Sequence, residues 1–261
     1  MPRSEAHIAL LIDADNSPAA KIDAILTELS TFGVTNVRRA YGNWKKSELK
    51  GWEEKLHEHA IRPMQQFDYS KGKNASDMAM VIDALELLYT DRPDAFGIVS
   101  SDADFTPLVM HLRAKGAAVY GFGAQKTPEP FVNACSRFLY LDRLGAAEVL
   151  EAPEMPAAKD ATVPVKPAQP LRVTPEQLKK DAKLISLLRG AVIACEDEDG
   201  WAKVGQVGTH IGNKTSFDPR NYGYATLTKL LEATGAFDLR DAGTSRVSVR
   251  DKRHFLASIV A

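Results

Sequence analysis

The sequence is poor in the residues that define several common classes of protein. It has only two cysteines, Cys135 and Cys195, which lie far apart in the chain, so two buried free thiols are expected. The six histidines show no zinc-type spacing. No apolar run approaches a membrane span, and residues 1–5 lead straight into an apolar strand without a secretory leader. These absences predict a cytoplasmic protein that uses neither zinc nor a membrane.

Charge and composition are also unremarkable. The 261 residues carry a net charge of −1, with 44% hydrophobic and 26% charged residues, as in an ordinary globular protein. Bulk charge therefore argues neither for nor against nucleic acid. The length allows one large domain or two modest ones.

Aspartates follow two apolar strands and begin one helix. The strand at residues 8–12 ends in Asp13-Ala14-Asp15-Asn16, and the strand at residues 96–99 ends in Ser100-Ser101-Asp102-Ala103-Asp104. Asp77 stands at the start of a predicted helix. The carboxyl ends of parallel strands form the ligand-binding edge of an open α/β sheet. A single aspartate at such a junction often only caps a helix, but three acidic ends in one domain favour a shared site.

Clustered carboxylates at this edge predict a bound cation. Two like charges about 4 Å apart repel by roughly 4 kcal/mol at an effective dielectric near 20, and a divalent cation relieves the repulsion. Neither His nor Cys stands among the acidic residues. We therefore expect Mg²⁺ or Mn²⁺, which prefer oxygen ligands. Such an ion orients a water and stabilises the leaving oxygen of a phosphodiester.

Apolar strands alternate with helical patterns through the first half of the chain, which predicts an α/β fold over residues 1–145. We expect three layers, with a mostly parallel sheet between helices. Pro63 in the strand at residues 61–67 indicates either an edge strand or a position at the start of the strand. Phe105, Leu108 and Leu112 share a helix face. The helix at Asp77 is expected to turn an apolar stripe to the core, formed by Met78, Val81, Ile82, Leu85 and Leu88.

The composition changes after Gly145. Prolines recur between Pro153 and Pro170, which predicts a semi-extended linker over residues 146–173. Residues 174–253 have the pattern of three helices and a terminal hairpin, a small winged-helix domain whose first helix is capped at Thr174. Residues 171–253 carry 14 Lys and Arg against 11 Asp and Glu, a net charge of +3. This second domain is therefore the basic one.

Basic and aromatic side chains flank the acidic segments. Lysines and arginines there could contact backbone phosphates, and an aromatic ring could stack on a base. An ordinary solvated surface is the competing interpretation for each lysine. The candidates are Arg38, Arg39, Tyr41, Trp44, Lys45, Lys46, Lys71 and Lys73.

Several motifs in order carry a family resemblance. They are the segment Ile12–Asn16, the segment Gly72–Asp77 with Asp83 six residues later, and the segment Val99–Phe105. With Val119–Gly123 and Phe131–Cys135, they resemble the NYN domain of the PIN-like nuclease superfamily, in its bacterial branch, over residues 6–143. The resemblance implies a PIN-like α/β/α sandwich and metal-dependent ribonuclease chemistry.

The same resemblance implies roles for individual residues. Asp15 stands where relatives often have a small residue, and Ser101 stands where glycine is common, but neither change obviously disables the site. The residues implied to bind metal or to act in catalysis are Asp13, Asp77, Asp102 and Asp104, with Asn16 and Ser100 in support.

Three segments of the tail resemble the OST-HTH (LOTUS) domain. They are Asp199–Ala202, Phe217–Gly223 and Leu230–Gly235. That family is a winged helix associated with RNA binding or protein contacts. Tyr222 fits the domain core as well as it fits a surface. The predicted contact residues are Arg220, Asn221, Tyr222, Tyr224 and Lys229.

The combined prediction is a metal-dependent ribonuclease or RNA-processing factor with an appended RNA-binding module. Its partner is single-stranded or structured RNA, and either domain could also hold a protein partner or a second copy. One alternative is a regulator that binds RNA or protein without catalysis. A second alternative is a haloacid-dehalogenase-like phosphatase, because Asp13 and Asp15 after a strand resemble that nucleophile motif. Asp15 would be essential in the phosphatase, and Asp77 and Asp102 in the nuclease.

Overall fold

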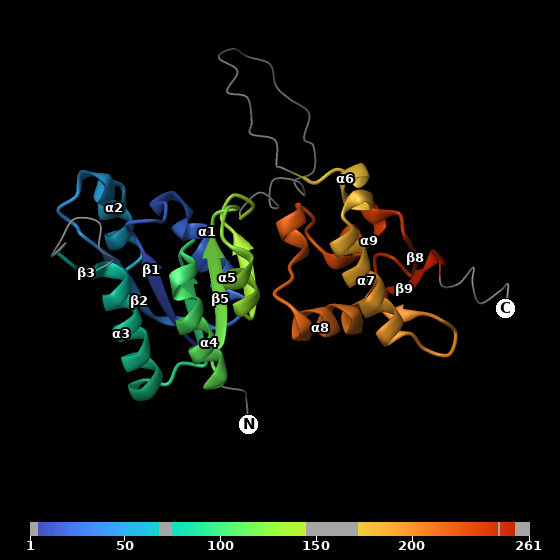
Figure 1. Cartoon of the computed structure of the whole chain (residues 1–261), viewed down its shortest axis with the longest axis horizontal. Coiled ribbons are helices and arrows are strands. Elements are labelled where there is room, and N and C mark those ends of the chain that lie inside the picture. Colours follow the sequence, from blue (N-terminus) through green and yellow to red (C-terminus); the bar gives the residue numbers. More distant parts are fainter. Residues whose placement is uncertain (1–4, 68–74, 145–171, 245, 254–261) are drawn as a thin grey trace, which may run out of the picture. The chain divides into compact units, whose positions relative to one another are not determined.

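The computed structural model describes residues 5–67, 75–144, 172–244 and 246–253, which form two compact units (Figure 1). The first unit ends at Leu144 and the second begins at Gly145. Most of the predicted linker, residues 146–171, lies outside the described residues. No helix in the described ranges is both long enough and apolar enough to cross a membrane.

The first unit is built on a six-stranded sheet in the order β3-β2-β1-β4-β5-β6, with every neighbouring pair parallel. The predicted mostly parallel sheet is therefore confirmed, and β3, which contains Pro63, is an edge strand. The strands are β1 (His7–Asp13), β2 (Val34–Gly42), β3 (Arg62–Gln65), β4 (Ala95–Val99), β5 (Ala118–Gly123) and β6 (Arg137–Tyr140).

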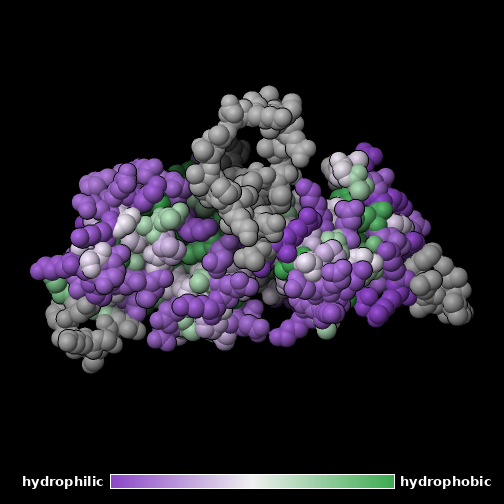
Figure 2. Space-filling view, turned by 90° about the horizontal axis from the view of Figure 1, so that it is seen from above, coloured by the Kyte–Doolittle hydropathy of each residue, from purple (hydrophilic) through white to green (hydrophobic). Residues whose placement is uncertain are grey.

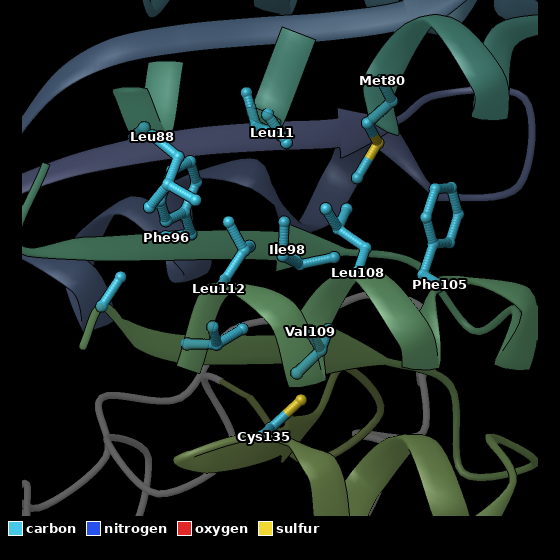
Figure 3. Packing of buried hydrophobic residues seen from close by; sticks show 14 of the residues in the cluster. Leu11, Met80, Leu88, Phe96, Ile98, Phe105, Leu108, Val109, Leu112 and Cys135 are labelled. Atoms are coloured by element: carbon cyan, nitrogen blue, oxygen red, sulfur yellow. The ribbon is translucent and has the colours of Figure 1, made fainter. Parts of the chain in front are cut away.

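Helices cover both faces of this sheet, as predicted. Because side chains alternate along β1, Leu11 packs into one core and Leu10 into the other. Figure 3 shows the first core, where Leu108 and Leu112 pack against Ile98. The helices are α1 (Ile22–Ser30) and α2 (Lys50–Glu58) on the second core, and α3 (Ala75–Thr90), α4 (Thr106–Ala114) and α5 (Glu129–Ala134) on the first.

The predicted apolar stripe of α3 is confirmed for Leu88, which is buried, and for Val81 and Leu85, which are partly buried against the core, but it is wrong for Met78 and Ile82. Met78 is 60% exposed and Ile82 is 62% exposed, whereas Met80, Ala84 and Leu87 are buried together with the predicted Leu88. Asp83 also faces the sheet, where it bonds Arg39 and Tyr41. The helix is apolar on both sides, so periodicity alone could not select its inner face.

The second unit contains a small antiparallel sheet with helices packed against it. The sheet order is β7-β9-β8, with β7 (Ala202–Lys203), β8 (Phe237–Arg240) and β9 (Ser248–Asp251). The predicted hairpin is present, but β7 was missed because two residues are too few to show a period. The helices are α6 (Pro175–Lys180), α7 (Ala182–Cys195), α8 (Val204–Lys214) and α9 (Leu227–Thr234).

The single helix predicted to start at Thr174 is two helices. Thr174 forms a capping box with Gln177 at the start of α6, as the sequence indicates. The chain then leaves helical geometry at Asp181, whose side chain accepts a hydrogen bond from the Leu184 backbone N–H at 3.0 Å. Asp181 therefore caps a new helix, because a short acidic side chain competes for backbone donors.

Both cysteines are free, as predicted. Cys135 is buried in the core between α4 and the sheet, and its environment raises the pKa of its thiol to about 12 through burial (Figure 3). Cys195 is only partly buried, at the end of α7, so the prediction of a buried thiol was wrong for that residue.

Candidate active site

Asp13 is a buried carboxylate at the carboxyl end of the central strand β1. It is 1% exposed and accepts hydrogen bonds from Ser100 Oγ at 2.9 Å and from Asn16 Nδ2 at 3.1 and 3.3 Å. Burial raises the pKa of Asp13, and the hydrogen bonds from Asn16 and Ser100 oppose that rise. The two predicted supporting residues therefore hold Asp13 in one orientation.

Asp102 and Asp104 follow the neighbouring strand β4. Ser100 Oγ accepts a hydrogen bond from the Asp102 backbone N–H at 3.1 Å, and Asp102 Oδ1 accepts one from the Asp104 backbone N–H at 2.8 Å. Asp102 thus caps the short 3-10 helix Ala103–Phe105 that leads into α4. Asp102 is partly buried and Asp104 is exposed, so both carboxyl groups keep access to solvent.

Ser101, in place of the usual glycine, has a structural partner. Its Oγ accepts a hydrogen bond from the Ala124 backbone N–H at 2.8 Å, just beyond β5. The two segments approach so closely that a Cβ on Gly123 would lie 2.7 Å from the Ser100 carbonyl oxygen. Ser101 therefore helps to fix the loop that carries Asp102 and Asp104.

Asp77, in the first turn of α3, is the acidic residue that a helix supplies to this edge of the sheet. Its pKa is raised to about 6, chiefly by burial and further by the negative charges of Asp13, Asp102, Asp15 and Asp104, in that order. Hydrogen bonds connect the same elements: Ser100 Oγ bonds both Asp13 and the Asp102 backbone, and Ser76, the neighbour of Asp77, donates to Asp15. Asp13, Asp15, Asp77, Asp102 and Asp104 thus lie at one edge of the sheet, which we call the acidic edge, and among the described residues no three of them have ligand atoms within 4.8 Å of one another.

Asp15 is the member of the acidic edge with a cationic partner. Its Oδ1 lies 3.3 Å from Lys46 Nζ, and its Oδ2 accepts a hydrogen bond from Ser76 Oγ at 3.0 Å. Lys46 offsets part of the negative charge, and Ser76 links the start of α3 to the segment after β1. The acidic edge still carries more carboxylates than cations among the described residues around it.

The acidic edge has a donor set that suits a hard divalent cation. All of its ligand atoms are oxygens, which Mg²⁺ and Mn²⁺ prefer, and Mg²⁺ keeps several waters between itself and surrounding carboxylates. The raised pKa of Asp77 reports negative charge that a cation would neutralise. Asp13, Asp77, Asp102 and Asp104 therefore fit the ion that the sequence predicts.

A tighter group of potential ligands lies elsewhere and is less suited to a metal. Within the described ranges, ligand atoms of Asp23, Glu58 and His59 all lie within 4.8 Å of one another. Lys55 Nζ lies 3.1 Å from Asp23 Oδ2 and 2.8 Å from Glu58 Oε2. The Lys55 ammonium already supplies the positive charge that would attract an ion, so we regard this group as a surface ion-pair network.

A buried polar network lies beneath Asp77 and was missed as a functional feature. Asp83, six residues further along α3, accepts hydrogen bonds from Arg39 and from the Tyr41 hydroxyl, both on β2. Tyr41 is 1% exposed, and burial together with Asp83 raises its pKa. These bonds anchor α3 to the sheet. Tyr41 and Arg39 are thus committed to Asp83, so the suggestion that Tyr41 stacks on a base was wrong.

The predicted basic and aromatic contacts are only partly near the acidic edge. Lys46 contacts Asp15, and Lys45 Nζ lies 5.1 Å from the centre of the Phe67 ring. Arg38 donates to the backbone carbonyls of Thr35 and His59, toward the other end of β2. The structure thus does not bring Arg38 to the acidic edge. Lys71 and Lys73 lie outside the described residues.

The predicted contact residues of the second unit have mixed positions. Tyr224 is 2% exposed and donates its hydroxyl to the Val173 carbonyl at 2.9 Å, so its prediction as a surface contact was wrong. Gly223 adopts φ 81°, and the resulting turn directs Tyr224 inward. Tyr222 is partly buried against the core, Arg220 pairs with Asp218 at 2.8 Å, Asn221 is partly buried, and Lys229 is exposed.

The fold and the acidic edge together define a PIN-like α/β/α domain followed by a winged-helix module. The NYN domain matches residues 7–142, and the chain belongs to the NYN family. The OST-HTH/LOTUS domain matches residues 176–249. Both resemblances predicted from the sequence are therefore confirmed.

Individual relatives show likeness without a known activity. An uncharacterized protein of Methanocaldococcus jannaschii is 32% identical over 127 residues, which cover 47% of this chain and 50% of that protein. This chain therefore spans half the length of that relative. A crystal structure of a protein of unknown function from Vibrio parahaemolyticus has a TM-score of 0.44, with 18% identity, and covers 54% of this chain and 95% of that one. A solution structure of an uncharacterized protein from Nitrosomonas europaea has a TM-score of 0.26, with 24% identity. The match covers 38% of this chain and 92% of that one.

Proposed function

We propose that this protein is a metal-dependent ribonuclease that hydrolyses RNA phosphodiester bonds at the acidic edge. The observation that carries the proposal is the hydrogen-bonded meeting of three acidic segments: Ser100 bonds both Asp13 and the Asp102 backbone, and Ser76, next to Asp77, bonds Asp15. The raised pKa of Asp77 agrees with this arrangement. Membership of the NYN family supports a nuclease-type activity, and the OST-HTH/LOTUS domain supports RNA as the polymer.

The four aspartates would hold Mg²⁺ or Mn²⁺, with Asp13 as the most rigid ligand because Ser100 and Asn16 fix its carboxylate. The ion would supply Lewis-acid stabilisation of the charge that develops on the phosphate. Asp102 and Asp104 present carboxyl groups from one capped turn, so their spacing is set by the backbone. The hydrogen bonds from Arg39 and Tyr41 to Asp83 attach α3 to β2 and so help to hold Asp77, at the start of α3, near the strand ends.

The basic side chains divide between substrate binding and charge balance. Lys46 lies at the acidic edge, where its ammonium balances Asp15 and can contact a phosphate that approaches the metal. The net charge of +3 over residues 171–253 supports a role for the second unit in holding the RNA backbone. In this proposal the second unit supplies affinity and the acidic edge supplies hydrolysis.

The phosphatase alternative is disfavoured by the surroundings of Asp15. A haloacid-dehalogenase-like acid must donate a proton to its leaving group. Here both oxygens of Asp15 have partners, Lys46 on one and Ser76 on the other. Asp77 also has no place in that mechanism, although it is central to the acidic edge.

A comparison of single aspartate variants tests the proposal. Asp102→Asn and Asp77→Asn are expected to abolish Mg²⁺- or Mn²⁺-dependent cleavage of labelled RNA, whereas Asp15→Asn retains a measurable rate. The phosphatase would be favoured if the wild type hydrolysed a phosphate monoester and only Asp15→Asn, among the three variants, lost that activity. RNA binding without cleavage in any condition would favour the non-catalytic regulator.

A further inference from the structure

A pocket of about 470 Å³ lies between helix α2 and the edge strand β3. Ile61, Pro63 and Gln65 alternate along the chain at β3 and line it from the strand side. From the helical side it is lined by residues spaced three or four apart, which share one face of a helix. These are Leu49, Lys50, Glu53, Leu56 and His57, and Trp44 completes the wall.

The pocket has an apolar floor and a polar rim. Leu49 and Ile61 are buried and Leu56 is partly buried, whereas Lys50, Glu53 and His57 are exposed at the mouth. A volume of this size with a few convergent polar groups is typical of a small-molecule or nucleobase site. The Glu53 carboxylate at the rim disfavours a phosphate as the occupant.

The pocket adjoins the acidic edge. A Cβ on Gly42 would lie 2.9 Å from Leu49 Cδ1 and 3.7 Å from Cγ of Asp15, so one glycine separates the pocket wall from the acidic edge. Lys46, which contacts Asp15, is two residues from Trp44 in the chain. A nucleotide bound with its phosphate near Lys46 therefore has its base within reach of the pocket.

Trp44 contributes a hydrogen-bond donor that lacks an acceptor. Its backbone N–H donates to Gln65 Oε1 at 3.1 Å, and Gln65 Nε2 donates to Asn43 Oδ1 at 3.1 Å, so this segment is firmly held. The indole Nε1 is screened from solvent and has no hydrogen-bond partner. Unpaired buried donors are rare and call for an explanation. A rotation of the ring that turned Nε1 toward the pocket would let a carbonyl oxygen of a bound base supply the acceptor.

The geometry points to a nucleobase subsite in the α2–β3 pocket, which receives a base of the RNA adjacent to the scissile phosphate. This inference rests on the proposed ribonuclease function. The subsite selects bases that carry a ring carbonyl, such as uracil, over adenine, because Trp44 offers a donor. Hydrophobic contact with Leu49, Leu56 and Ile61 supplies affinity that does not depend on charge.

Two rim positions on α2 provide a matched pair of variants. Glu53 lines the pocket, whereas the adjacent exposed Glu54 does not. Glu53→Trp is expected to fill the pocket, and Glu54→Trp adds the same side chain outside it. Neither residue is buried, so both variants should fold. Trp44→Phe keeps an aromatic ring and removes the indole N–H together with part of the ring surface.

The first measurement is the ratio of dissociation constants for oligo(A) and oligo(U) hexamers on the full chain. The wild type and Glu54→Trp are expected to bind oligo(U) at least about fivefold more tightly. Glu53→Trp and Trp44→Phe should bring the ratio close to one. Equal binding of the two hexamers by the wild type, or a ratio unchanged in Glu53→Trp, would overturn the subsite.

The second measurement locates the base directly. A hexamer that contains 5-iodouridine, which keeps both uracil carbonyls, is crosslinked to the wild-type chain and the modified peptide is identified by mass spectrometry. Crosslinks to Trp44 or His57 are expected, and crosslinks confined to other segments contradict the subsite. Both measurements read binding, so base preference without cleavage would overturn the ribonuclease and retain the subsite. Cleavage without base preference would retain the ribonuclease function and overturn the subsite.

Discussion

The Asp13 carboxylate is, after burial itself, the strongest influence on the pKa of Asp77, which rises from its ordinary value of 3.8 to about 6. The first residue ends the central strand, and the second lies in the first turn of α3. Two carboxylates that oppose each other's ionisation are costly to keep together. A cation that both residues bind would offset this cost.

Removal of the Asp77 charge is expected to stabilise the metal-free protein. The folded chain holds the Asp77 proton more tightly than the unfolded chain does. The contribution of Asp77 to the wild-type free energy of unfolding therefore falls as the pH rises from about 4 to about 6. In EDTA, Asp77→Asn should therefore gain stability over the wild type through that window, reaching about 1 to 2 kcal/mol at pH 7 after allowance for solvent screening. Urea unfolding at pH 4 and pH 7 checks this, and an equal difference at both values would contradict it.

A divalent cation is expected to stabilise the wild type more than a variant that lacks one of the proposed metal ligands. A ligand that binds only the folded state stabilises it by about 2.7 kcal/mol at a hundred times its dissociation constant. Mg²⁺ or Mn²⁺ should thus raise the unfolding midpoint of the wild type and raise that of Asp13→Asn much less. Asp23→Asn is the matched control, because Asp23 belongs to the Lys55 ion-pair network. Equal shifts in wild type and Asp13→Asn would place the metal elsewhere.

Tyr41→Phe is expected to weaken the attachment of α3 to the sheet. The substitution leaves one oxygen of the Asp83 carboxylate without the hydroxyl donor that it has in a buried site. Loss of a hydrogen bond to a charged group costs about 1.5 to 3 kcal/mol. Urea unfolding should show a loss of that size, and hydrogen exchange should show faster opening of α3. Tyr89→Phe, on the exposed face of the same helix, should change stability little.

Lys46→Ala is expected to weaken RNA binding at low salt and to flatten its salt dependence. A lysine that contacts one phosphate contributes about one unit to the slope of log affinity against log salt. The measurement is a fluorescence anisotropy titration at several salt concentrations. Lys55→Ala provides the control, because Lys55 pairs with Asp23 and Glu58. Identical slopes for the two variants would remove Lys46 from the RNA contact.

Sequence reasoning was most reliable where one signal had one physical meaning. An apolar strand that ends in Asp13 or in the Ser100–Asp104 segment predicts an acidic edge, because parallel strands place their carboxyl ends together. It failed where two solutions satisfied the same pattern. The helix α3 is apolar on both sides, so its pattern placed Leu85 and Leu88 correctly and misplaced Met78 and Ile82. It also gave no sign that Asp83 is buried against Arg39 and Tyr41.

The remaining errors have similar local causes. Asp181 interrupts a continuous helical pattern because its side chain caps the next helix, and capping competes with helix continuation within a single residue. Tyr224 lies in a polar segment that is typical of a surface, but the left-handed turn at Gly223 directs its side chain into the core. The pocket beside α2 combines residues from three segments, so no single stretch of sequence predicts it.

The most direct test of the central claim is cleavage of end-labelled RNA by the purified full chain, wild type and Asp102→Asn, with Mg²⁺ or Mn²⁺ and with EDTA. Single-stranded and structured RNA are both used. The account predicts cleavage by the wild type with metal, none with EDTA, and none by Asp102→Asn under any condition. RNA that is bound but intact with either metal, or equal cleavage by wild type and Asp102→Asn, would contradict hydrolysis at the acidic edge.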